Sequence, residues 1–152
     1  MTDGLVGPTP FTFRQAWVDV VSVDIPEEMA TITERHAGEK LRFFAVVDPD
    51  DREVDPVRLR SDLEWTENRE QLVQGELMEV VAKESYEQEM NATNVNQIIK
   101  VADDKVLFTG FVADDVVVAA FDRGIFGSLP PIVSEFAEFM RAHDIDFVSL
   151  EM

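Results

Sequence analysis

Apolar residues recur along the chain at two spacings, one typical of strands and one typical of helices. The strand spacing is clearest over residues 95–122, where valine and phenylalanine fill three segments separated by Asp-Asp pairs at 103–104 and 114–115. Alternation with a two-residue period is typical of strands. Aspartate favours tight turns because its side chain can hydrogen-bond to its own backbone. The pattern therefore predicts a three-stranded antiparallel meander.

Two further strands are predicted upstream of the meander. The segment LRFFAVV at 41–47 predicts a buried strand, and DPDDRE predicts the turn that follows it. A second strand, without a clear end, is predicted from alternating positions: Val57, Leu59, Ser61, Leu63 and Trp65. Together with the meander, these segments predict an α+β fold with an antiparallel sheet of about five strands.

Three helices are predicted around this sheet. The first begins near Pro26, because proline and the following glutamates suit an early helical turn, and it ends at Gly38. The second and longest covers 68–90, with one apolar stripe through Val73, Leu77, Val80 and Val81. The third begins after Ser128, a suitable N-cap residue, and extends to about residue 143.

The chain ends follow the pattern less closely. Residues 1–10 contain two glycines and two prolines and predict a flexible lead-in, with a single domain over 11–152. Residues 11–25 fit both strand alternation and a helical stripe, and their valine content favours a strand. The tail IDFVSLEM is compatible with an additional edge strand.

Both faces of the predicted meander are apolar, whereas one face of an antiparallel sheet usually meets water. The second face must then be covered, either by helices of this chain or by another protomer. The candidate interface positions on the meander are Val106, Phe108, Val112, Val116, Val118 and Phe121.

Charge changes this picture more than any motif does. Thirty-one acidic residues against thirteen basic ones give a net charge of −18, and only four of the basic residues are lysines. The carboxylates are spread along the chain, which is typical of proteins from halophilic archaea. At molar salt the Debye length is about 3 Å, so like charges barely repel. We therefore expect halophilic adaptation.

The same composition excludes several classes of function. An acidic surface opposes nucleic-acid binding, which needs basic residues that displace counterions from phosphate. The absence of cysteine excludes disulfides and thiolate chemistry. No apolar run is long enough to cross a membrane, and the first residues lack the pattern of a secretory signal. We expect a cytoplasmic protein without membrane insertion.

Candidate catalytic and metal-binding residues are few. The acidic run that begins at Asp48 fails the EF-hand pattern, because its sixth position is Glu53 and its twelfth is Leu59. His36 and His143, the only histidines, lie near predicted helix ends, and no third ligand is indicated. Phosphate-binding glycine motifs and a G-x-S-x-G sequence are absent. The sequence therefore predicts no enzyme, no metal and no cofactor.

The order of predicted elements resembles the roadblock/LC7 domain, a relative of profilin-like folds, over roughly residues 26–143. The resemblance lies in the hairpin FFAVVDPDDREVDPVRL, the helix 68–90, the meander 96–122 and the helix after GIFGSL. The segment DPVRLRSDLEW also resembles small haloarchaeal proteins. The longer first turn, residues 11–25 and the tail depart from the minimal domain, and they leave PAS-like or ferredoxin-like sheets as alternatives.

The resemblance implies a non-catalytic homodimer that binds another protein, such as a small Ras-like GTPase or a signalling complex. Two other hypotheses stay open at this point. One is a small-molecule sensor of PAS-like layout, with a candidate pocket between sheet and helix lined by Phe43, Phe108, Phe111 and Phe121, of which Phe43 and Phe111 are the main candidates. The other is a hydrolase-type enzyme that uses His36 or His143 with a carboxylate.

Overall fold

The computed structural model describes residues 24–112 and 114–145. The predictions for residues 1–10, for residues 11–23 and for the tail from residue 146 lie outside these ranges.

Within the described residues, five strands form one antiparallel sheet, as the α+β prediction requires. They are β3 (Leu41–Val47), β4 (Val54–Leu59), β5 (Gln97–Val101), β6 (Lys105–Val112) and β7 (Asp115–Asp122). Their spatial order is β4-β3-β7-β6-β5, so β7, the last of the described strands in sequence, lies at the centre. There it pairs with β3 on one side and β6 on the other. The predicted meander is confirmed.

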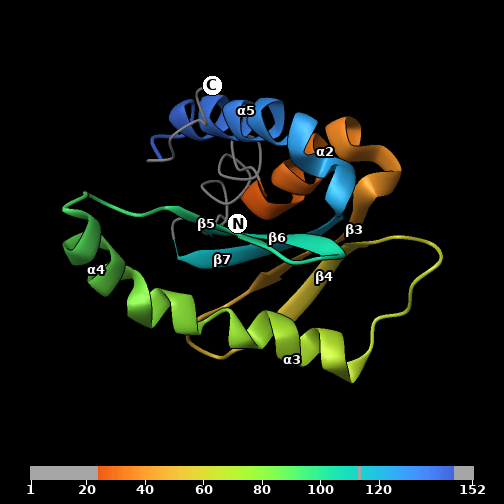
Figure 1. Ribbon diagram of the computed structural model, residues 1–152, viewed down its shortest axis with the longest axis horizontal. Helices are drawn as coiled ribbons and strands as arrows, with labels where there is room; N and C mark the ends of the chain where they lie inside the picture. Colours follow the sequence, from red (N-terminus) through yellow and green to blue (C-terminus); the bar gives the residue numbers. More distant parts are fainter. Residues whose placement is uncertain (1–23, 113, 146–152) are drawn as a thin grey trace, which may run out of the picture.

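Helices cover both faces of this sheet (Figure 1). On one face lie α2 (Ile25–Ala37) and α5 (Leu129–Arg141), each joined to a strand by a short 3-10 helix, Gly38–Lys40 and Arg123–Gly127. On the other face lie α3 (Glu67–Gly75) and α4 (Met78–Met90). The sheet is therefore the middle of three layers.

The ends of α2 follow the sequence prediction. The Asp24 carboxylate accepts a hydrogen bond from the Glu27 backbone N–H at 3.1 Å, which satisfies one of the free donors of the first turn. A proline lies in that first turn. Gly38 ends the helix with a φ of 56°, a left-handed backbone that glycine adopts without strain. Sequence and structure agree here because both helix ends are fixed locally.

The second predicted strand is shorter than its alternation suggests. β4 ends at Leu59, and Ser61, Leu63 and Trp65 lie in the connection to α3. The chain turns away because the Leu63 N–H donates to the Arg60 carbonyl at 2.9 Å. The Trp65 ring then packs edge-on against Phe43, with ring centroids 5.2 Å apart. The alternating pattern predicted a strand at Trp65, whereas the structure has a connecting segment there with a partly buried ring.

The long helix predicted over 68–90 is divided in two. The N–H groups of Glu76 and Leu77 donate to carbonyls three residues earlier, so a tight turn separates α3 from α4. The predicted apolar stripe divides with it: Val73 and Leu77 are buried, whereas Val81 is 78% exposed. Ser128 precedes α5 as predicted, but its hydroxyl makes no cap hydrogen bond.

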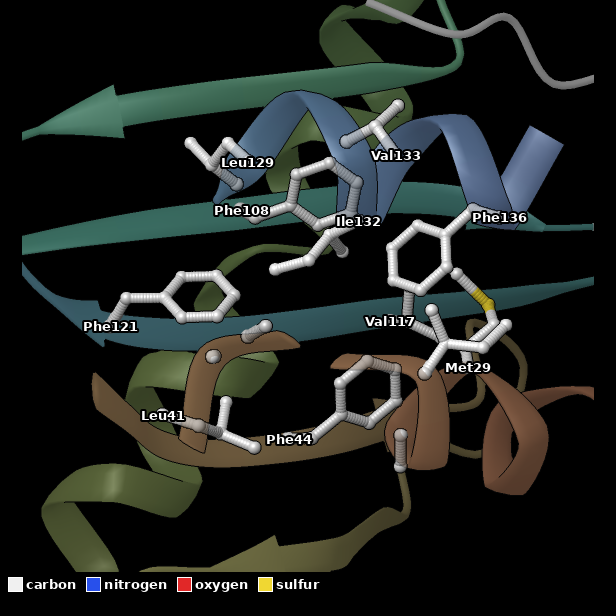
Figure 2. Packing of buried hydrophobic residues seen from close by; sticks show 14 of the residues in the cluster. Met29, Leu41, Phe44, Phe108, Val117, Phe121, Leu129, Ile132, Val133 and Phe136 are labelled. Atoms are coloured by element: carbon white, nitrogen blue, oxygen red, sulfur yellow. The ribbon is translucent and has the colours of Figure 1, made fainter. Parts of the chain in front are cut away.

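Two apolar clusters fill the spaces above and below the sheet. Figure 2 shows the larger one, in which Phe44, Phe108 and Phe121 of the strands meet α2 and α5 side chains such as Met29 and Phe136. The smaller one joins Val47, Val116 and Val118 to Val73 and Leu77 at α3. The prediction that both sheet faces are covered is confirmed, and helices of this chain cover them.

Candidate functional site

The six candidate interface residues of the meander all lie inside the protomer. Each is at most 2% exposed. Val106, Phe108, Val112 and Phe121 point toward α2 and α5, and Val116 and Val118 point toward α3. Because helices of the same chain cover these side chains, none of them is presented to a partner. An interface on this protomer must use other residues.

The phenylalanines proposed to line one pocket lie on opposite faces of the sheet. Phe43 and Phe111 belong to the cluster beneath α3, whereas Phe108 and Phe121 belong to the cluster beneath α2 and α5. Phe108 packs against Phe136 with ring centroids 5.9 Å apart. The alternation of strand side chains explains the separation, since neighbouring positions point to opposite faces. The four rings do not form one pocket.

Helix α4 directs Glu79 toward the sheet and exposes its largest apolar side chains beside polar ones such as Glu84 and Gln88. Glu79 is 8% exposed, while Met78 is 69% and Val81 78% exposed. In an ordinary surface helix the apolar stripe faces the core. This inverted arrangement leaves the exposed apolar side chains of α4 free to meet another surface.

A polar network between α4 and the sheet, centred on the half-exposed Lys100, supports this inverted orientation. The Lys100 ammonium lies 2.9 Å from the Glu76 carboxylate and also pairs with Glu79. The Thr109 hydroxyl donates to Glu76 at 2.7 Å, and the Tyr86 hydroxyl donates to Glu79 at 2.7 Å. The hydrogen bond from Lys100 holds the pKa of Glu79 below its ordinary value, and the Tyr86 bond adds to this effect. One strand lysine thus neutralises two nearly buried carboxylates.

The C-terminal end of α4 adjoins the edge of the sheet. Among the described strands, β5 pairs only with β6 and therefore forms an edge. Beside it, a hollow of about 460 Å³ is lined by uncharged residues from the end of α4 to the start of β5, among them Tyr86, Met90, Val95 and Ile98. We call Met78, Val81, Met90 and the β5 edge the α4–β5 surface. It combines exposed apolar side chains with a strand edge that can accept another strand.

The two histidines lie apart, each bound within the helix layer. His36 of α2 lies 2.7 Å from the Glu135 carboxylate of α5, and Arg35 binds the same carboxylate at 2.6 Å. The hydrogen bonds from His36 and Arg35 hold the pKa of Glu135 below its ordinary value. The His143 ring bonds to the Phe139 carbonyl one turn earlier in the chain, at 2.9 Å. The His36–Glu135 pair thus joins two helices.

The acidic turn after β3 uses its carboxylates for its own backbone. Asp48 accepts from the Asp50 N–H at 2.7 Å, and Asp51 accepts from the Glu53 N–H at 2.8 Å. Over residues 24–112 and 114–145, no cluster of three or more histidine or acidic side chains is arranged to hold a metal ion. In the same ranges, every helix is too short or too polar to cross a bilayer.

The family of the chain follows from a family model that matches residues 27–141, described as "Domain of unknown function (DUF7522)". The matched region begins in α2 and ends with α5, so it includes the sheet and all the described helices. The chain belongs to the DUF7522 family. A comparison with curated proteins gives no match.

Solved structures show the same fold as this DUF7522 chain at low sequence identity. MglB of Myxococcus xanthus is 11% identical with a TM-score of 0.57, covering 77% of this chain and 95% of MglB. A structure described as MglB with tetrameric arrangement is 12% identical with a TM-score of 0.57, covering 79% and 90%. A roadblock/LC7 domain from Streptomyces avermitilis is 12% identical with a TM-score of 0.51, covering 80% and 98%. The predicted roadblock/LC7 layout is confirmed.

Sequence reasoning missed the residues that form the α4–β5 surface. It placed Val80 and Val81 on the same stripe as Val73, as if 68–90 were one straight helix. The available signal was Glu76 and Glu79, two carboxylates inside that apolar stripe. Buried carboxylates need a cationic partner, and a chain with four lysines has few to offer.

Proposed function

We propose that this DUF7522 chain is a non-catalytic interaction domain that forms a homodimer and binds a further protein, with a small Ras-like GTPase as the partner class. The roadblock/MglB-like fold supports the proposal, because roadblock/LC7 domains typically dimerise and regulate such GTPases. A fold alone is weak evidence for function. The observation with the greatest weight is therefore the inverted helix α4.

The α4–β5 surface is the self-association surface in this proposal. Met78, Val81 and Met90 are each at least 69% exposed on one helix. Large exposed apolar patches on soluble proteins are typical of interaction sites. A second copy of the same surface would cover these side chains and extend the sheet at β5, which satisfies the free backbone groups of that edge. A two-fold axis makes such a surface complementary to itself.

The surface also fits the charge of the molecule. A chain with a net charge of −18 repels its own copies unless the contact region is uncharged. The hollow beside β5 is lined only by uncharged residues. Two copies can meet at this hollow without bringing carboxylates together, whereas the exposed Glu84 and Glu89 of α4 must stay outside the contact.

Size-exclusion chromatography with light scattering in molar KCl tests the proposal. The wild-type chain should have twice the mass of the 17.2 kDa monomer. Val81→Lys and Met90→Lys should each give monomers, because a buried unpaired ammonium opposes the contact. Phe126→Lys is the matched control: Phe126 is 44% exposed and belongs to the 3-10 helix before α5, on the opposite layer.

A monomeric wild-type protein would contradict the homodimer, and a dimeric Val81→Lys protein would contradict this surface. The same tagged proteins serve as baits at native salt in a halophilic host lysate. A Ras-like GTPase retained by the wild-type protein and by Phe126→Lys supports the partner class. Recovery of other protein classes alone opposes it.

A further inference from the structure

A second, half-open hollow of about 390 Å³ lies between the start of α3 and the sheet. This volume is within the range of small-molecule sites. Its floor is apolar, with Phe43, Leu107 and Ala120 from three different strands. It lies on the α3 side of the sheet, the lower layer in Figure 1.

The charged residues that line this hollow are all basic, although the whole molecule is strongly acidic. Arg42, Arg69 and Lys105 contribute to the lining, and no lining residue is acidic. The whole chain has thirteen basic residues against thirty-one acidic ones. By contrast, another hollow lined by Lys40 and Arg60 also contains Glu39, Asp62 and Asp122. An acid-free basic lining is therefore a specific feature of the hollow beneath α3.

Two of its three cations are not neutralised by a close carboxylate among the described residues. Arg42 pairs with Asp122 at 2.8 Å. The Arg69 guanidinium donates instead to the neutral Glu64 carbonyl at 2.7 Å. Lys105 has a carboxylate only at 3.9 Å, from the exposed Asp104. Arg69 and Lys105 thus leave net positive charge at the hollow.

We propose that this hollow binds a small organic anion with an apolar body, such as an aromatic carboxylate. The ring would lie on Phe43, Leu107 and Ala120, and the carboxylate would accept hydrogen bonds from Arg69 and Lys105. The apolar floor favours such a ligand over chloride, which gains nothing from apolar contact. The inference adds a ligand to the proposed interaction domain and rests on residues outside the α4–β5 surface.

An amide NMR titration with benzoate, in KCl at which the protein is folded, tests the proposal. Shifts should saturate and concentrate at residues 42–43, 66–72, 105–107 and 120. Benzamide, which has the same shape without the charge, should bind about tenfold more weakly. Arg69→Gln and Lys105→Gln should each weaken benzoate binding about tenfold. Arg141→Gln removes an exposed charge at the end of α5 and should leave binding unchanged.

Three results would overturn the proposal. The first is equal binding of benzoate and benzamide. The second is a set of shifts outside the hollow, or equal weakening by Arg141→Gln. The third is that monomeric Val81→Lys binds benzoate but the wild-type dimer does not. That result would indicate that an acidic side chain of the second copy occupies the hollow. Well-dispersed amide spectra of the variants show that they are folded. A monomeric wild-type chain that still binds benzoate would contradict only the homodimer.

Discussion

Lys100 ties α4 and the turn before it to the sheet through one half-exposed ammonium group. Its partners Glu76 and Glu79 are 7% and 8% exposed. Two carboxylates at that depth repel each other and lose part of their hydration, and the lysine offsets both costs. At this position a charged residue specifies how a helix packs.

Lys100→Met should therefore destabilise the fold by about 2 kcal/mol at pH 7, because it leaves two buried carboxylates unpaired. The folded-state pKa of Glu79 is below its ordinary value of 4.5. The pair thus stabilises the fold fully above about pH 4.5, and the stabilisation is lost as the pH falls through the lower folded-state value. The difference in unfolding free energy between the wild-type protein and Lys100→Met should therefore become smaller as the pH falls below 4.5. Urea unfolding at several pH values in molar KCl measures it.

Lys40→Met is the matched control for this series. Lys40 is an exposed lysine without a carboxylate within 4 Å among the described residues, so its loss should change stability little. If the loss of unfolding free energy in Lys100→Met did not change with pH, the packing of the side chain, and not its charge, would be the stabilising factor.

The division of 67–90 into two helices is a property of the element, and it shows how far the sequence alone can predict this fold. Strands β3, β6 and β7 were predicted within one or two residues, because valine-rich alternation and the turn aspartates are local signals. The break at Glu76–Leu77 was not predicted, because it depends on Lys100 and Thr109, which are distant in sequence. The α4–β5 surface follows from that break and was missed for the same reason.

Replacement by alanine should change the stability of the fold in opposite directions at Gly75, the last residue of α3, and at Gly110 in β6. A Cβ at Gly75 would meet no atom within 4 Å, and its backbone is helical. Gly75→Ala should stabilise the fold by about 0.5–1 kcal/mol. A Cβ at Gly110 in β6 would lie 3.1 Å from Phe108 and 3.2 Å from Val117, so Gly110→Ala should destabilise it by about 1–3 kcal/mol. Thermal unfolding of both proteins measures the difference, and a stabilising Gly110→Ala would contradict the packing of β6 against β7.

At the scale of the whole molecule, the acidic surface determines the conditions in which the fold is stable. The described ion pairs use many of the basic residues, including Arg42 and Arg60, which share Asp122. With thirty-one acidic residues against thirteen basic ones, many carboxylates must stay unpaired even if every cation is used. Their mutual repulsion opposes the compact state when salt does not screen it.

The melting temperature should therefore rise by about 10 °C between roughly 0.1 M and 2 M KCl, as screening shortens the Debye length. Sucrose at equal osmolality is the control, since it favours burial without screening charge. Circular dichroism follows the transition. A melting temperature that stays constant in KCl, or that rises equally in sucrose, would be inconsistent with halophilic adaptation.

The central position of β7 has a consequence for synthesis on the ribosome. Residues 41–59 and 97–112 form two separate hairpins, and only residues 115–122 join them into one sheet. Until that last strand emerges, the nascent chain holds two hairpins with open edges, which are prone to pair with other chains. The sheet can therefore form only after residue 122 has emerged, and a premature stop before residue 115 would leave fragments for chaperones or proteases rather than a smaller working domain.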